Sequence, residues 1–353
     1  MIQVDTPCRL HFGLLAYNRE ESRQFGGAGL MVAEPRISVR VAPADAFRVT
    51  GPMAERAGAF AQTFAAKWAA RQAASGRGNR GSLHGAEIHI TDAPRPHTGL
   101  GSGTHLGMVI ARARAELADP KEATTLGVDE LAGLVSRGAR SAIGAYGFFH
   151  GGFIIEGGKR DPLSLSPMLV QQPFPPHWRL VLITPDKLVG LSADREVQAF
   201  AKMISIPREV TAEMCRLTLL GLLPALIERD LSTFSAALYD MQQRVGMCFA
   251  AAQGGIYADP LLERIVKFIR AQGVEGVGQS SWGPTLYAVT ESERSAQELA
   301  TRVRDEFELA QREVLVTAAD NAGCKVSGAE VKSVEAKSDQ KDRVRSPLPP
   351  GEG

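Results

Sequence analysis

The sequence lacks several features that mark particular classes of protein. It has only four cysteines, and none of them forms a pair at the spacing of a metal site. Its net charge is only +1, so no basic excess points to nucleic acid as a partner. No stretch approaches the ~20 uninterrupted apolar residues of a membrane span, and no basic segment followed by an apolar run opens the chain. We therefore expect a cytoplasmic enzyme with reduced thiols that binds neither nucleic acid nor membrane.

The composition is that of an ordinary globular chain. Of the 353 residues, 44% are hydrophobic and 22% are charged, which suits one or two domains with an ample core. A proline-rich stretch at 173–176 is typical of a linker, so we expect one domain over 1–172 and a second over 177–325. Residues 326–353 are polar and contain several prolines, which predicts a disordered tail.

A glycine-rich turn leads directly into a helix between Arg95 and Leu117. Apolar residues recur at three- and four-residue spacings after the turn, which predicts a helix over 105–117. The glycines permit close approach of a ligand, and the free N–H groups of a helix start attract an anion. We expect a phosphate or pyrophosphate here. The alternative for the turn is a tight connection without a ligand, and the alternative for His105 is a position on the helix surface. The candidate binding residues are Gly99, Gly101, Ser102, Gly103, Thr104 and His105.

Two other segments near the start of the chain carry positive charge. The segment 2–17 alternates like a strand and presents Arg9 and His11 together, and Arg23 stands at the edge of a later glycine turn. Arginine pairs with phosphate or carboxylate through two hydrogen bonds, and histidine donates or relays a proton. These three residues are candidate catalytic groups, and the alternative for the first two is the solvated face of an edge strand.

Two further helices and one late loop complete the set of segments that matter for function. The periodicity predicts helices over 53–74, with aromatic residues in the core, and over 128–140. A short glycine-rich loop lies within 273–290 and includes Ser280, Ser281 and Trp282. Its hydroxyls suit a phosphate and its indole suits stacking on an aromatic acid, while a core tryptophan is the alternative.

Three separated segments resemble the GHMP superfamily of small-molecule kinases, in the same order along the chain. They read PCRLHFG near the start, GLGSGTHLG before a helix and GVGQSSWGPTLYAV late in the chain. The superfamily loop Pro-x-x-x-Gly-Leu-Gly-Ser-Ser corresponds to Pro96 through Ser102, with Gly103 in place of the second serine. The resemblance implies a two-domain α/β fold, with a mixed N-terminal domain and a ferredoxin-like C-terminal domain.

Three departures from the kinase pattern disfavour phosphoryl transfer. Gly144 stands where the resemblance would place a catalytic aspartate. The first motif has Pro7-Cys8-Arg9 in place of Pro-Gly-Lys, and residues 279–282 replace several consecutive glycines. An ATP-dependent small-molecule kinase and a non-catalytic metabolite-binding protein therefore remain as alternatives rather than as the main expectation.

Within the superfamily, the sequence resembles the β-ribofuranosylaminobenzene 5'-phosphate synthase branch of methanopterin biosynthesis. The segments RLHFG, FGGAGL, SAIGAYGFFHGGFIIEGG and GQSSWGPTLYA carry this resemblance. It implies condensation of phosphoribosyl pyrophosphate with 4-aminobenzoate, with loss of pyrophosphate and carbon dioxide, and it suggests a homodimer. Such a reaction needs a cradle for the leaving group, and we expect Mg²⁺ to be carried with the pyrophosphate, since the sequence offers no compact carboxylate cluster as a protein metal site.

Overall fold

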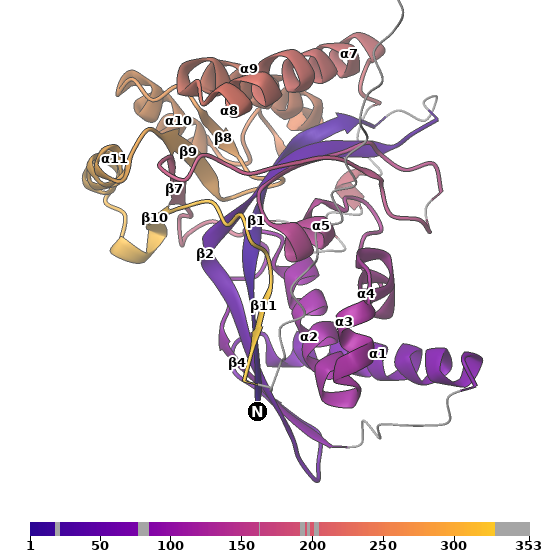
Figure 1. Cartoon of the computed structure of the whole chain (residues 1–353). Coiled ribbons are helices and arrows are strands. Elements are labelled where there is room, and N and C mark those ends of the chain that lie inside the picture. Colours follow the sequence, from indigo (N-terminus) through magenta and orange to yellow (C-terminus); the bar gives the residue numbers. More distant parts are fainter. Residues whose placement is uncertain are drawn as a thin grey trace, which may run out of the picture.

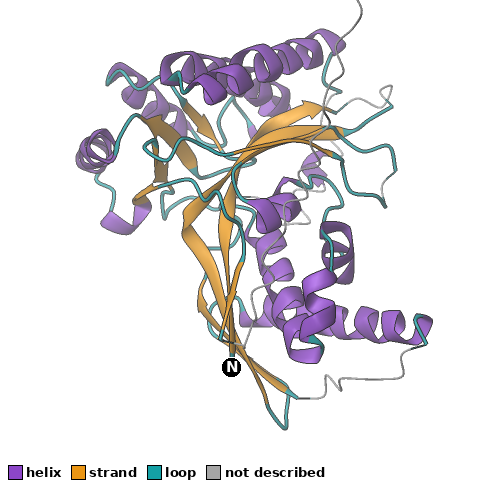
Figure 2. Ribbon diagram, in the orientation of Figure 1, coloured by secondary structure: helices purple, strands orange, loops and turns teal. Residues whose placement is uncertain are grey.

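The computed structural model describes residues 1–328, except for 18–21, 77–84, 162, 191–194, 196–197 and 201–204. The expected tail therefore lies almost entirely outside the described residues. Two β-sheets with helices packed against them form the described chain (Figures 1 and 2). The first sheet has seven strands and the second has four. The expected two-part α/β architecture is confirmed.

The first sheet is built around two long antiparallel strands, β1 (Ile2–Ala16) and β2 (Phe25–Pro43). Alternating apolar side chains of both strands are fully buried, as expected for strands covered on one face. Only the pairing of β3 with β4 is parallel, so the sheet is mixed. The remaining strands are β3 (Arg48–Thr50), β4 (Ala86–Asp92), β5 (Phe153–Glu156), β6 (Met168–Gln172) and β11 (Lys325–Ser327).

Five helices cover one face of this sheet (Figure 1). The helix α2 is central, and its side chains are buried on nearly all sides because it contacts β1, β2 and the four other helices. This placement fixes the glycine turn at its start against the sheet. The five helices are α1 (Ala54–Ala74), α2 (Ser102–Ala118), α3 (Pro120–Thr125), α4 (Val128–Leu134) and α5 (Ile143–His150).

The second sheet is antiparallel throughout and has the strand order β10-β7-β9-β8. Its apolar side chains form a separate core with those of α10 and α11. The helix α9 contacts β1 of the first sheet and β8 of the second. The elements are β7 (Arg179–Ile183), α9 (Leu231–Gln253), α10 (Pro260–Ala271), β8 (Val277–Gln279), β9 (Leu286–Thr290), α11 (Glu293–Phe307), the short helix η2 (Gln311–Glu313) and β10 (Val314–Thr317).

One continuous helical segment is apolar enough to be compared with a membrane span. It consists of α7 (Arg208–Leu217), the π-helical turn η1 (Thr218–Leu222) and α8 (Leu223–Glu228). Pro224 has no N–H to donate, and the wider π turn before it accommodates that missing bond. The segment meets the length and hydropathy of a membrane helix, which is weak evidence by itself. It is partly buried and packs against α9.

The structure corrects two expectations about where elements end. The helix expected over 128–140 ends at Leu134, because Ser136 and Gly138 adopt left-handed backbone conformations with φ of 54° and 84°. The chain after β10 also returns to the first sheet, where Ala319 bridges to β2 and β11 pairs with β1. The end of the segment expected to belong to the second domain thus packs on the first.

Candidate active site

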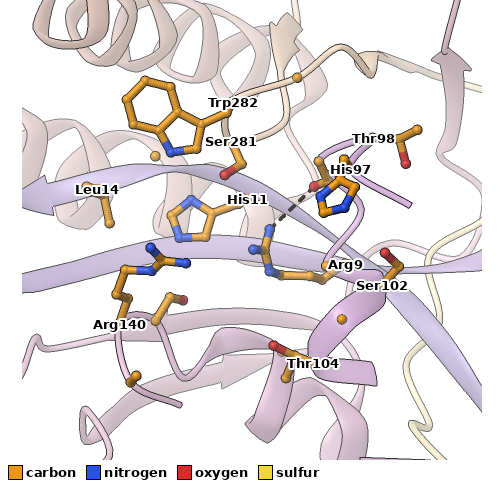
Figure 3. A pocket seen from close by; sticks show the side chains of 18 of the residues that line it. Arg9, His11, Leu14, His97, Thr98, Ser102, Thr104, Arg140, Ser281 and Trp282 are labelled. Atoms are coloured by element: carbon orange, nitrogen blue, oxygen red, sulfur yellow. Dashed lines mark hydrogen bonds between the residues drawn. The ribbon is translucent and has the colours of Figure 1, made fainter. Parts of the chain in front are cut away.

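A cavity of about 460 Å³ lies where β1, the start of α2, the turn before α5 and the loop between β8 and β9 meet (Figure 3). Positive charge dominates its wall, and no carboxylate of the described chain lines it. A cavity of this size suits a small-molecule ligand, and its charge selects an anion. The charged and titratable lining residues are Arg9, Arg56, Arg137, Arg140, His11 and His97.

The glycine turn forms one wall of this cavity, as the sequence predicts. Gly99 and Gly101 have φ of 84° and 69°, values that glycine adopts without strain. The N–H groups of Ser102 and Gly103 donate to no acceptor in the described chain, while those of the next two residues bond to the Gly101 carbonyl. Two free donors at the positive end of α2 therefore face the cavity, which is the geometry of an anion site. The lining residues of this turn are Gly99, Gly101, Ser102, Gly103 and Thr104.

Arg9 and His11 point from β1 into the cavity, beside Arg140 (Figure 3). Arg9 Nη1 makes a long hydrogen bond of 3.5 Å to the Gly99 carbonyl oxygen, which ties the guanidinium to the glycine turn. Burial, and then the neighbouring Arg9 charge, lower the pKa of His11 well below its usual value. His11 is therefore neutral at physiological pH and acts as a hydrogen-bonding group rather than as a cation.

Two residues that line the cavity hold strained backbone conformations. His97 and Ser281 have φ of 60° and 55°, although neither is glycine. The Ser281 N–H donates to the His11 carbonyl at 3.2 Å, and the His97 carbonyl accepts the Gly190 N–H at 3.0 Å. Such strain is retained where the surrounding structure fixes it, and it is common at functional sites.

Aromatic side chains form the opposite, apolar side of the cavity. The Trp282 ring lies 4.4 Å from the Phe249 ring and 5.3 Å from the Phe200 ring, measured between centroids. Trp282 is only 5% exposed, so it is both a core residue and a wall of the cavity. The Arg140 guanidinium lies 5.2 Å from the Phe200 centroid, at the border between the apolar and the cationic sides.

The structure places three of the candidate residues away from the cavity wall. Arg23 is exposed, and its Nη1 donates to the Gly158 carbonyl at 2.8 Å. The Ser280 hydroxyl is buried, accepting from the His11 N–H and donating to the Gly99 carbonyl, so it has no proton left for a phosphate. His105 lies neither on the cavity nor on the helix surface: it is fully buried, with Nδ1 3.2 Å from Thr6 Oγ1.

Sequence reasoning missed three arginines that line the cavity, namely Arg56, Arg137 and Arg140. All three fall within segments expected to be helices, where arginine reads as a solvated surface residue. Arg137 and Arg140 lie outside the helix because it ends at Leu134. Gly138, which lies between them, is the sequence signal that could have indicated this early end. Arg56 lies in the first turn of α1, and nothing in its local sequence distinguishes it from a surface residue.

Comparisons with known sequences give matches over part and over most of the chain. Residues 222–309 match the family model described as "GHMP kinases C terminal". The chain is 32% identical over 340 residues to the β-ribofuranosylphenol 5'-phosphate synthase of Archaeoglobus fulgidus, covering 92% of this chain and 99% of the relative.

Two solved structures share the fold. A homoserine kinase from Cytophaga hutchinsonii superimposes with a TM-score of 0.65 at 18% identity, over 92% of this chain and 97% of the kinase. A structure described as MDDEF in complex with MVAPP, AMPPCP and magnesium superimposes with a TM-score of 0.62 at 13% identity, over 92% and 98% of the two chains. At these identities the likeness concerns the fold.

Proposed function

The chain belongs to the β-ribofuranosylphenol 5'-phosphate synthase family of the GHMP superfamily, and from this premise we propose that it joins phosphoribosyl pyrophosphate to 4-aminobenzoate. In this reaction the ring carbon that bears the carboxylate attacks the anomeric carbon. The bond from that carbon to pyrophosphate breaks, and the bond from the ring to the carboxylate then breaks to release carbon dioxide. The pair of electrons from the second bond restores the aromatic ring.

The observation that supports this proposal is a cavity with four arginines and no lining carboxylate among the described residues. The leaving group and the sugar phosphate are both anions, and they need cations and N–H donors. The reaction removes no proton from either substrate, so it needs no carboxylate base. Phosphoryl transfer to an alcohol commonly uses such a base, and Gly144 lines the cavity where the kinase aspartate would stand. The kinase alternative is therefore disfavoured.

The two sides of the cavity suit the two substrates. The glycine turn at 99–104 and Arg9 would hold the pyrophosphate, whose negative charge increases as its bond to the sugar breaks. The apolar side, with Trp282 and Phe249, would hold the ring so that its reacting carbon faces the sugar. Excluding water there protects the reactive sugar cation from hydrolysis.

Mg²⁺ would enter as part of the diphosphate substrate. Within the described ranges, no three histidine, cysteine, aspartate or glutamate side chains gather in a way that could hold a metal ion. The protein's own contribution to charge neutralisation is therefore the arginines and the N–H groups. We also propose a homodimer, which size-exclusion chromatography with light scattering would test.

The ring substituent is open to a direct comparison. The relative's name refers to a phenol, so its aromatic substrate carries a hydroxyl where 4-aminobenzoate carries an amine. Both groups donate electrons to the opposite ring carbon, which is the carbon that must attack. The purified protein should therefore be assayed with 4-aminobenzoate and 4-hydroxybenzoate, each labelled at the carboxyl carbon, together with phosphoribosyl pyrophosphate and Mg²⁺.

We expect carbon dioxide and pyrophosphate in equal amounts, with both substrates required. Arg9→Gln should lower turnover by about tenfold or more, because it removes a charge-assisted hydrogen bond from the leaving group. Arg294 lies on α11, and its side chain is 90% exposed. Arg294→Gln removes the same charge and should leave turnover unchanged. Folded wild-type protein that releases no carbon dioxide from either acid would refute the proposal, and ATP-dependent phosphorylation of an alcohol would then favour the kinase.

A further inference from the structure

Two guanidinium groups converge on the first turn of α2, at the position where the chain departs from the superfamily loop. A Cβ atom on Gly103 would collide with Arg56 Nη2 and would lie 3.4 Å from Arg137 Nη2. Both cations therefore reach one point beside the free N–H groups of the turn. Serine at position 103, as in the superfamily pattern, would occupy the space that the Arg56 guanidinium fills.

Phe60 holds the two arginines in this place. The Cζ atom of Arg56 lies 6.0 Å from the centroid of the Phe60 ring, and that of Arg137 lies 5.5 Å from it. Contact with one ring reduces the freedom of both side chains before a ligand arrives. The sequence suggested that Phe60 is a core residue. In the structure it also serves as a platform for two cations.

Arg56 brings an uncompensated positive charge to this place. Among the residues that the structure describes, no carboxylate pairs with Arg56 and no acceptor takes a hydrogen bond from it. Partial burial lowers its pKa, because the charged form loses water without gaining a partner. Two like charges held together at the positive end of a helix repel each other, and a ligand with two or more negative charges would relieve that repulsion.

The neighbours of the glycine turn give the order of the subsites. Gly99 packs against the Ser280 carbonyl in the β8–β9 loop, beside the apolar side of the cavity. Gly101 packs against the Arg9 side chain, and Gly103 against Arg56 and Arg137. A diphosphate laid along the turn with its sugar toward the aromatic side would therefore put its distal phosphate at Gly103.

We propose that Arg56 and Arg137, supported by Phe60, bind the distal phosphate of the diphosphate, and that glycine at position 103 admits them. The assignment rests on the proposed function for the identity of the diphosphate as part of phosphoribosyl pyrophosphate. It makes the two arginines leaving-group residues, because they contact the far end of the diphosphate, whose total negative charge increases when the bond from its proximal phosphate to the sugar breaks. It also explains why this chain departs from the superfamily loop at its second serine.

The test measures binding without turnover. Isothermal titration calorimetry with pyrophosphate and Mg²⁺ would compare the wild-type protein with Arg56→Gln, Arg137→Gln and Gly103→Ala. Gly103 has no positive φ, and alanine favours a helix, so the third variant should fold while displacing a flexible guanidinium. Arg294→Gln is the control for the loss of one positive charge, and ribose 5-phosphate is the control ligand without a diphosphate.

We expect each of the three variants to bind pyrophosphate about tenfold or more weakly, whereas ribose 5-phosphate affinity stays within about twofold. Wild-type affinity for pyrophosphate in folded Arg56→Gln and Gly103→Ala would overturn the proposal. Equal weakening of both ligands would also overturn it, since that would indicate a general loss of positive potential. A wild-type protein that binds pyrophosphate but releases no carbon dioxide would refute the proposed reaction and leave this subsite standing.

Discussion

At the scale of single residues, burial decides what two histidines near the glycine turn do. His105 is fully buried, and burial together with the Arg9 charge lowers its pKa to about 3. The pKa of His11 is also lowered, by burial and by the Arg9 charge. The sequence shows a histidine beside a phosphate loop, which suggests a donor to pyrophosphate. The structure makes His105 a neutral side chain inside the fold, a distinction that depends on packing from β1 and not on its neighbours in the chain.

These histidines make the fold sensitive to acid. An unfolded histidine binds a proton below about pH 6.5, whereas folded His105 stays neutral down to about pH 3. The stabilisation that neutral His105 contributes is therefore complete above about pH 6.5 and is lost as the pH falls toward about 3. His105→Asn should reduce this slope by up to about 1.4 kcal/mol per pH unit in urea unfolding between pH 7 and pH 4. The exposed His177→Asn is the control, and an equal slope in wild type and His105→Asn would contradict the assignment.

At the scale of elements, the periodicity of the sequence predicts most helices and strands. The segments expected at 53–74 and 105–117 appear as α1 and α2, because each has an apolar stripe that packs on the first sheet or its neighbouring helices. The early end of α4 could not be read in the same way. Ser136 and Gly138 turn the chain, and contacts from β5 and from the segment after it hold the loop that carries Arg137 and Arg140 into the cavity.

Two side chains fix that loop from behind. The Lys159 ammonium donates to the Gly138 carbonyl at 3.1 Å, and Glu156 Oε2 accepts the Ala142 N–H at 2.7 Å. Glu156 is completely buried, so Glu156→Ala would leave the Ala142 N–H without an acceptor. We expect Glu156→Ala to lower the free energy of unfolding by about 1–3 kcal/mol and to weaken diphosphate binding, because the loop that carries Arg137 loses one of its anchors.

Glu156→Gln is the matched variant for this prediction, because its amide oxygen can still accept the Ala142 N–H. It should keep diphosphate affinity close to that of the wild type, as measured by calorimetry, and lose less stability than the alanine variant. If both variants bound the diphosphate as the wild type does, the loop would not depend on this carboxyl group, and its positioning role would be refuted.

At the scale of the whole molecule, the site exists only where the two sheets meet. The order of three motifs along the sequence implied the two-domain architecture, but not how the domains are joined. Ser280 joins them: its hydroxyl accepts the His11 N–H at 3.0 Å and donates to the Gly99 carbonyl at 2.8 Å. These partners lie 269 and 181 residues away in the chain, so no local pattern could reveal the connection. The sequence pointed to Ser280 and Ser281 as equivalent phosphate donors, and the structure separates them.

The different environments of Ser280 and Ser281 give a prediction for their alanine variants. Ser280→Ala leaves the buried His11 N–H without a partner and leaves the Gly99 carbonyl with only its long bond from Arg9, which should lower the free energy of unfolding by about 1–3 kcal/mol. Ser281→Ala removes a hydroxyl that lines the cavity, so it should leave stability within about 0.5 kcal/mol and lower turnover instead.

Apolar side chains from both halves pack into one main core. We therefore expect a single transition when urea unfolding of the wild type is monitored by fluorescence and by circular dichroism. Two transitions in Ser280→Ala would mean that this hydroxyl couples the halves. Equal stability of the two variants would mean that packing alone joins them.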